Sequence, residues 1–190
     1  MNNVKEKPAG DRWSISSEDV DFSGSWRPIV DNKFKKEYDD YLKCCGQNVI
    51  FRNLAKSVLG LVTEVIQHEG TDLTIAGTTP AGTWTRTLVS SGTDLTHTEF
   101  EPIYVDIVDP DGDKVKVESF WQDDGQTHVS ILRGKPRVQG GIFESRRYLL
   151  QDGDETSKLI CESFFHASEE SPSNKFQSSN VTWSFQKVSD

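Results

Sequence analysis

The sequence predicts a mainly β protein: a ten-stranded antiparallel up-and-down β-barrel with a helix-turn-helix lid between the first and second strands. Three observations predict this fold. One strand-like segment, residues 23–30, precedes two short amphipathic helices within residues 34–59, and only strand-like segments follow. Their spacing of roughly 8–15 residues is typical of an antiparallel barrel or sandwich. A helical lid over one mouth of a barrel usually covers an enclosed space. We therefore expect a cavity inside the barrel.

The lid prediction depends on a helical repeat of apolar side chains. In the first helix one face is apolar and the other is charged, the apolar residues being Phe34, Tyr38, Tyr41, Leu42 and Cys45. Asn32 is the expected N-cap, Gly46 suits a left-handed position after the last turn, and Asn48 is the expected N-cap of the second helix. The second helix has its own apolar stripe, which we expect to pack on the core: Ile50, Phe51, Leu54, Ala55 and Val58.

From residue 61 the sequence period changes from helical to strand-like. The expected strands are residues 61–68, 73–76, 83–89, 94–100, 114–121, 127–132, 142–150, 158–166 and 180–188, and residues 104–108 extend or follow the 94–100 strand. Clusters of Gly, Pro, Asp and Ser separate them. The loop 109–113 superficially resembles a calcium loop, but Lys114 and Phe120 stand where an EF-hand needs Gly and Glu. We therefore interpret it as a tight turn.

Length and charge restrict the domain organisation and the partners. The 190 residues suit one barrel domain, residues 21–190, after a polar segment, residues 1–20, that we expect to be a flexible extension. Thirty acidic residues against 21 basic ones give a net charge of −9, which argues against nucleic acid and anionic membrane surfaces as partners. No apolar run is long enough for stable membrane insertion.

The cysteines and the first residues predict a cytoplasmic protein. The three cysteines, Cys44, Cys45 and Cys161, are an odd number without a disulfide framework, which favours reduced thiols. Residues 1–13 contain no apolar segment of the kind that directs secretion. We therefore expect a cytoplasmic location, and we expect a monomer.

Five stretches of the chain resemble the intracellular lipid-binding proteins, the fatty-acid-binding and retinoid-binding branch of the calycins. They are the Gly-x-Trp at residues 24–26, the lid segment 41–55, residues 114–129, residues 146–149 and residues 158–162. The resemblance covers residues 22–188. It implies a barrel of two orthogonal sheets around a cavity, ligand access near the helices, and a cytoplasmic carrier of a small apolar ligand with no cofactor.

The resemblance also suggests candidate binding residues. In this family a carboxylate ligand is typically held by an arginine on the eighth strand and an Arg-x-Tyr pair on the last. Arg147 falls at the eighth-strand position, with Ser145 on the same face; a one-residue slip would instead turn Arg146 and Tyr148 inward. The last-strand pair is replaced by Trp183-Ser184-Phe185.

This replacement changes the expected ligand. Trp183 and Phe185 suit ligand contact and core packing beneath the lid equally well. Together with Trp84 they favour a flat, conjugated or cyclic ligand, such as a retinoid, over a simple fatty acid. The carrier hypothesis thus covers a fatty acid, a retinoid or a flat conjugated molecule.

No motif predicts conventional catalysis or metal binding. The four histidines lie on different segments without metal-ligand spacing, so no metal site is expected. His128 could point into the barrel, where an imidazole can exchange a proton. Some crustacean luciferases resemble this barrel, so the alternative function is a cofactor-free cavity enzyme that uses Arg147 and His128 on a bound aromatic substrate. A third hypothesis is a protein-interaction module, for which the sequence offers no motif.

Overall fold

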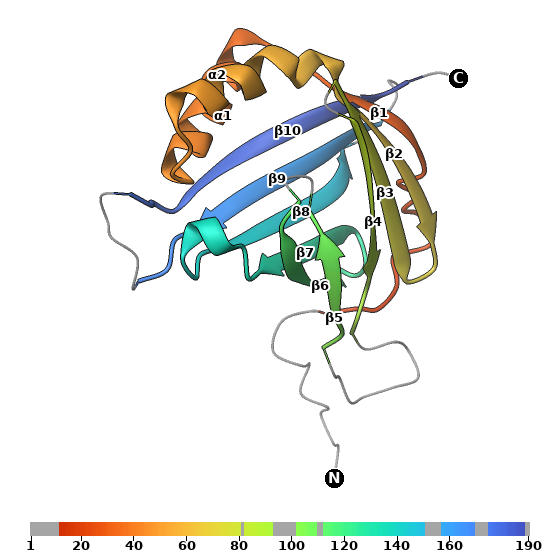
Figure 1. Ribbon diagram of the computed structural model, residues 1–190. Helices are drawn as coiled ribbons and strands as arrows, with labels where there is room; N and C mark the ends of the chain where they lie inside the picture. Colours follow the sequence, from red (N-terminus) through yellow and green to blue (C-terminus); the bar gives the residue numbers. More distant parts are fainter. Residues whose placement is uncertain are drawn as a thin grey trace.

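The computed structural model describes residues 12–80, 82–92, 102–109, 112–150, 157–169 and 175–188. One ten-stranded antiparallel sheet, in the order β4-β3-β2-β1-β10-β9-β8-β7-β6-β5, curls into a nearly closed barrel with two helices over one mouth (Figure 1). The strands are β1 (Gly24–Pro28), β2 (Thr63–Glu69), β3 (Asp72–Thr79), β4 (Gly82–Val89), β5 (Tyr104–Val108), β6 (Lys114–Gln122), β7 (Thr127–Arg133), β8 (Ile142–Leu150), β9 (Lys158–His166) and β10 (Ser179–Lys187). The helices are α1 (Asn32–Cys44) and α2 (Val49–Val58), with short 3-10 turns η1 (Leu59–Leu61) and η2 (Pro136–Val138).

The predicted fold class is confirmed, and several strand boundaries differ from the prediction by one to three residues, among them those of β2 and β3. β2 begins at Thr63 because η1 continues from α2 through Leu61. β3 extends to Thr79, since it pairs with β4 along its whole length. The strand expected at residues 94–100 lies outside the described residues, and β5 is the separate strand Tyr104–Val108.

The helix caps are confirmed at one helix and corrected at the other. Asn48 caps α2 by accepting a hydrogen bond from the backbone N–H of Phe51 at 2.9 Å. The N-cap of α1 is Asp31 rather than Asn32: its carboxylate accepts from the backbone N–H of Phe34 at 2.7 Å. Asp31 has the extended backbone that a cap needs, whereas Asn32 is already helical. Gly46 has φ of +75°, the predicted left-handed conformation.

The two helices differ in how deeply they pack. α1 buries Phe34, Tyr41 and Leu42 near β10. The apolar stripe expected to pack α2 on the core is only partly used, because Ile50 is 79% and Leu54 62% exposed and no residue of α2 is fully buried. α2 instead contacts α1 through ion pairs of Arg52 and Lys56 with Asp39. Only Phe51 and Ala55 of the stripe reach the apolar cluster beneath the lid.

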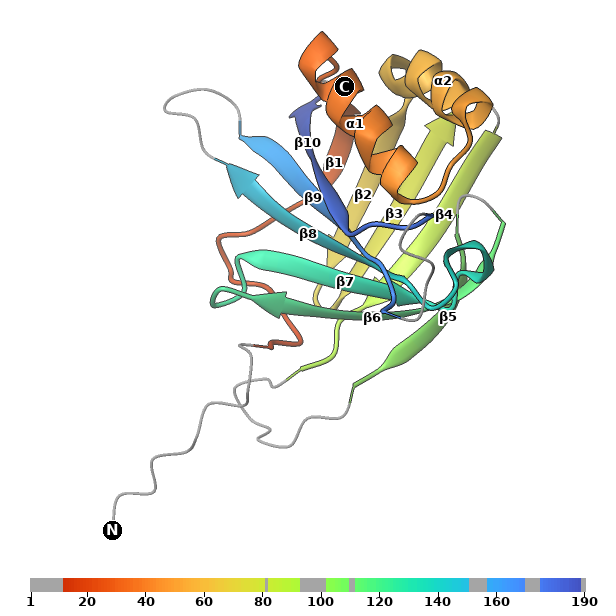
Figure 2. The ribbon, with the colours of Figure 1, turned by 90° about the vertical axis from the view of Figure 1, so that its left-hand side faces the viewer.

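At the end of the barrel away from the helices, a segment that precedes β1 packs against β6 (Figure 2). Trp13 and Trp121 exchange two backbone hydrogen bonds of 2.8 Å, and Ser17 N–H donates to the Gly125 carbonyl at 3.0 Å. The side chain of Phe22 is inaccessible and contacts the rings of His68 and Trp121. Residues 12–20, which the sequence assigns to an extension, thus contact the barrel, and residues 1–11 lie outside the described residues.

Candidate functional site

Alternating side chains of the strands line the interior of the barrel. On β8, Arg147 is only 3% exposed, while Arg146 points outward and donates to Glu144 at 2.6 Å. The register therefore turns Arg147 inward, and the alternative slip does not occur. Phe143, Ser145 and Leu149 share its face, because side chains alternate along a strand.

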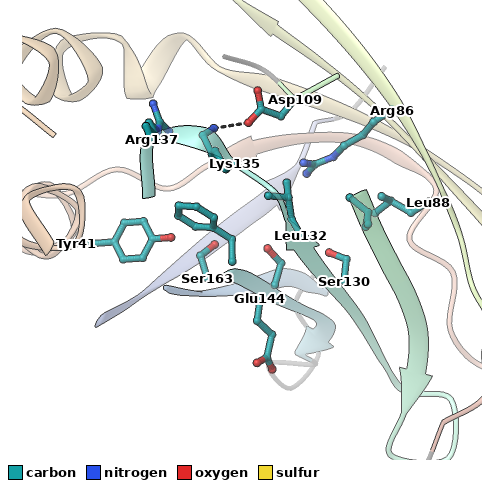
Figure 3. Close-up of a pocket in the computed structure, with 13 residues that line it drawn as sticks. Tyr41, Arg86, Leu88, Asp109, Ser130, Leu132, Lys135, Arg137, Glu144 and Ser163 are labelled. Atoms are coloured by element: carbon teal, nitrogen blue, oxygen red, sulfur yellow. Dashed lines mark hydrogen bonds and ion pairs between the residues drawn. The ribbon is translucent and has the colours of Figure 1, made fainter. Parts of the chain in front are cut away.

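The interior holds two neighbouring pockets, with cavity volumes of about 170 Å³ and 240 Å³. Both are lined by Arg86, Ser145 and Ser163, so they meet in the middle of the barrel. The smaller pocket is lined by Tyr41 of α1 and by a buried ion pair of Lys135 with Asp109 (Figure 3). The remaining lining residues of the larger pocket are Val62, Glu64, Trp84, Arg147, Cys161, Trp183 and Phe185.

Five of the six residues predicted as ligand contacts line the larger pocket: Trp84, Ser145, Arg147, Trp183 and Phe185. The Arg147 Nη1 donates to the Ser130 hydroxyl of β7 at 3.4 Å, which holds the guanidinium toward that wall. These positions make the five residues candidates for ligand binding.

Trp183 packs beneath the lid and also lines the larger pocket. Its ring meets Phe34 and Tyr38 of α1 at centroid distances of 4.8 Å and 5.0 Å, so it packs beneath the lid. It also stacks on Phe185 at 6.1 Å, and both rings face the larger pocket. Together they form an aromatic wall of the cavity.

His128, the sixth predicted residue, points inward but lines neither pocket. Its ring is fully buried, stands edge-on to Trp121 at 5.0 Å, and lies beside Arg147 in the strand register. Neither ring nitrogen has a hydrogen-bond partner among the described residues. Burial, reinforced by the charge of Arg147, keeps its pKa well below 6.5, so the imidazole is neutral.

The structure adds a residue that the sequence interpretation missed. Arg86 of β4 lines both pockets, and its guanidinium carbon lies 4.9 Å from the ring centre of Trp84. Burial, together with the charge of Arg147, lowers the pKa of Arg86 to about 10. Its signal was present in the sequence, because Trp84, Arg86 and Leu88 alternate on one face of the strand.

The position of the Trp84 side chain depends on a glycine in the neighbouring strand. Gly77 of β3 is the cross-strand partner of Trp84, and a Cβ at position 77 would stand 2.2 Å from Cε2 of the indole. The missing side chain lets the indole lie against the sheet wall. Trp84 and Arg86 therefore line the cavity without filling it.

Within the ranges that the structure describes, no group of three His, Cys, Asp or Glu side chains is arranged to hold a metal ion. None of the helices described is long and apolar enough to cross a membrane.

Comparison with solved structures identifies the fold. Human cRBP IV aligns with a TM-score of 0.54 and 18% identity over 89% of this chain and 99% of that one. The REP1-NXSQ fatty acid transporter aligns with a TM-score of 0.55 and 18% identity over 88% and 96%. A point mutant of the same transporter gives 0.53 and 19% over 87% and 97%. No family model and no curated protein sequence matches the chain.

The chain therefore has the fold of the fatty-acid-binding-protein-like calycins, a barrel with a helical insert between its first two strands.

Proposed function

We propose that the protein is a carrier that encloses one small, largely apolar ligand inside the barrel. The observation that carries the proposal is the cavity itself, which lies beneath a helical lid and joins an aromatic wall to two inward arginines. Pockets of a few hundred Å³ with apolar walls and few polar groups are typical of small-molecule sites.

The walls favour a flat or conjugated ligand. Trp84, Trp183 and Phe185 offer three ring surfaces, and aromatic rings stack on planar apolar molecules at little cost in conformational entropy. A retinoid or another conjugated molecule suits this lining, and a fatty acid remains within the proposed range. The titles of the solved neighbours, a retinol-binding protein and a fatty acid transporter, support the same range.

The proposal extends to where and how the protein works. We propose a cytoplasmic, monomeric carrier without a cofactor. The three cysteines are free thiols in the structure, which suits a reducing compartment.

The test is native purification followed by extraction with organic solvent, with mass and absorption spectra of the extract. A stoichiometric apolar or coloured molecule is expected. Ser163→Phe is the matched variant, because Ser163 lines both pockets and a phenyl ring there would fill their junction. It should fold but carry no ligand. An empty extract, with no response of the wild type to neutral hydrophobic dyes, would refute the carrier function.

The alternative function, a cofactor-free cavity enzyme, stays a prediction. No contact between the two residues that it needs and a common pocket supports it. It requires Arg147 and His128 to meet one substrate, and of these two only Arg147 lines a pocket. Turnover of a bound aromatic substrate, lost in His128→Ala while binding persists, would favour it over a carrier.

A further inference from the structure

The segment that precedes β1, residues 12–22, packs against the end of the barrel away from the helices, and we call it the strap (Figure 2). It buries Val20 and Phe22 in the main apolar cluster, where they are 7% and 0% exposed. The ring of Phe22 lies 5.7 Å from that of His68 on β2 and 5.3 Å from that of Trp121 on β6, centre to centre. The strap therefore packs on a titratable side chain.

A hydrogen bond joins the strap to an acceptor that acid removes. The backbone N–H of Phe22 donates to Nδ1 of His68 at 3.5 Å. Only an unprotonated ring nitrogen can accept this bond, because both nitrogens of an imidazolium carry a proton. The contact therefore requires the neutral ring with its proton on Nε2. Protonation of Nδ1 would make two N–H groups face each other, so the attraction between the strap and β2 would become a repulsion.

The surroundings of His68 favour the neutral imidazole. Asp21 of the strap attracts an imidazolium, and Lys187 of β10 interacts with the same carboxylate. Trp121 stacks on His68 at 5.0 Å and meets the neutral ring of His128 edge-on at 5.0 Å. The remaining charged groups of this region act on His128, and both are positive: Arg86 of β4 and Arg147 of β8. Burial outweighs the attraction of Asp21, so the pKa of His68 is lowered from its usual 6.5.

The direction of the pH effect follows from this burial. With the strap in place, His68 binds a proton less readily than an exposed imidazole does, so release of the strap is accompanied by proton uptake. Lower pH therefore favours release. The attachment is at full strength above about pH 6.5, the ordinary pKa of histidine, and weakens as the pH falls below that value.

The other attachments of the strap lie on β6 and involve no histidine. Trp13 exchanges two backbone hydrogen bonds of 2.8 Å with Trp121. Arg12 pairs with the buried carboxylate of Glu118, and its guanidinium carbon lies 4.0 Å from the ring centre of Phe120. Substitution of Arg12 therefore weakens the strap without touching the imidazole.

We propose that residues 12–22 are an acid-released strap and that His68 is its pH sensor. In neutral solution the imidazole accepts the Phe22 N–H, and the strap covers this end of the barrel. In acid the protonated ring can no longer accept that donor, and the strap detaches while the barrel stays folded. Neither His68 nor Phe22 lines either pocket, so this device is separate from the site of the proposed carrier.

Amide hydrogen exchange of the full chain, followed by NMR and corrected for the intrinsic pH dependence of exchange, measures release. The amides of Trp13, Ser17 and Phe22 report on the strap, because each donates a hydrogen bond to the barrel. The amides of β8 and β9 report on global unfolding. From about pH 7.5 to about pH 5.5 the opening of the strap should increase severalfold, up to about tenfold, the limit for one imidazole with an ordinary pKa when exposed. The strap should open more readily than β8 and β9 at both pH values.

Three variants separate the sensor from the attachment. His68→Asn should remove the pH dependence of strap opening, because an amide oxygen can accept the Phe22 N–H and does not titrate. His128→Gln is the matched control, a buried histidine without a contact to the strap among the described residues, and should leave that dependence in place. Arg12→Gln should increase strap opening by the same factor at both pH values.

Two results of the exchange experiment would overturn the proposal. One is a strap whose protection is equal at both pH values or falls only together with that of β8 and β9. The other is a pH dependence that persists in His68→Asn and disappears in His128→Gln. If His68→Asn already releases the strap at neutral pH, an NMR titration of the wild-type His68 ring replaces it: a pKa below 6.5 supports the sensor, and a pKa at or above 6.5 overturns it.

Discussion

The indole of Trp84 lies against the backbone of Gly77 on the neighbouring strand, where a Cβ would approach Cε2 to 2.2 Å. This contact determines how much of the barrel interior is open, because the same indole lines the larger pocket and supports the guanidinium of Arg86. Gly77 lies on the other side of the indole ring from the pocket. Its lack of a side chain thus determines how far Trp84 extends into the candidate site.

Gly77→Ala is therefore expected to push Trp84 into the cavity. The free energy of unfolding should fall by about 1–3 kcal/mol, the usual cost of overpacking, and binding of neutral apolar dyes should weaken. Denaturant unfolding and dye titration measure the two effects. Gly60→Ala is the control, since nothing lies within 4 Å of a Cβ built there. If adding Trp84→Leu to Gly77→Ala does not restore stability, the clash is not the cause.

The start of α1 gives a prediction that separates two adjacent residues. Asp31→Ala should lower the free energy of unfolding by about 1 kcal/mol, because it removes the acceptor of the Phe34 N–H. Asn32→Ala should change it by less than about 0.5 kcal/mol, as for an exposed helical position. Equal effects in thermal or urea unfolding would contradict the assignment of Asp31 as the cap.

The segment before β1 should contribute to the stability of the barrel. Trp13 packs against the main apolar cluster and pairs with Trp121, so Trp13→Ala should cost about 2 kcal/mol or more of unfolding free energy. Ile15, which is 41% exposed, provides the control Ile15→Ala, with a much smaller expected loss. Unchanged unfolding of the Trp13 variant would show that residues 12–20 add nothing to the fold.

His128 predicts a loss of stability in acid. Its pKa in the folded protein lies well below 6.5, so between these values the unfolded chain binds more protons than the folded one. Stability should therefore decrease as pH falls below about 6.5, by at most about 1.4 kcal/mol per pH unit from this group. His68, whose pKa is also lowered by burial, adds in the same direction. His128→Gln should flatten the stability curve over this range.

Urea unfolding at a series of pH values measures this effect. Parallel curves for the wild type and His128→Gln would mean that the imidazole is protonated equally in both states. That result would contradict a neutral buried His128.

The alternation of inward and outward side chains along the strands predicted much of the site. It did not predict every residue of it. The face of β8 that carries Ser145 and Arg147 was predicted correctly, because alternation is a local property of any strand. The same rule applied to β4 places Arg86 on the face of Trp84 and Leu88 and would have found it, but the sequence interpretation considered only Trp84 on that strand. The packing of α2 was overestimated, since amphipathicity shows which face is apolar and not whether a partner covers it.

By itself the sequence determined the order of the helices and strands, the lid between the first two strands and the inward face of β8, because each depends on residues close together in the chain. Only the tertiary structure decided that Arg86 and Arg147 share a pocket, that Gly77 makes room for Trp84, and that His128 lies outside the cavity lining. These relationships depend on strand register and on the curvature that closes the barrel. Both are collective outcomes of packing between segments far apart in the sequence.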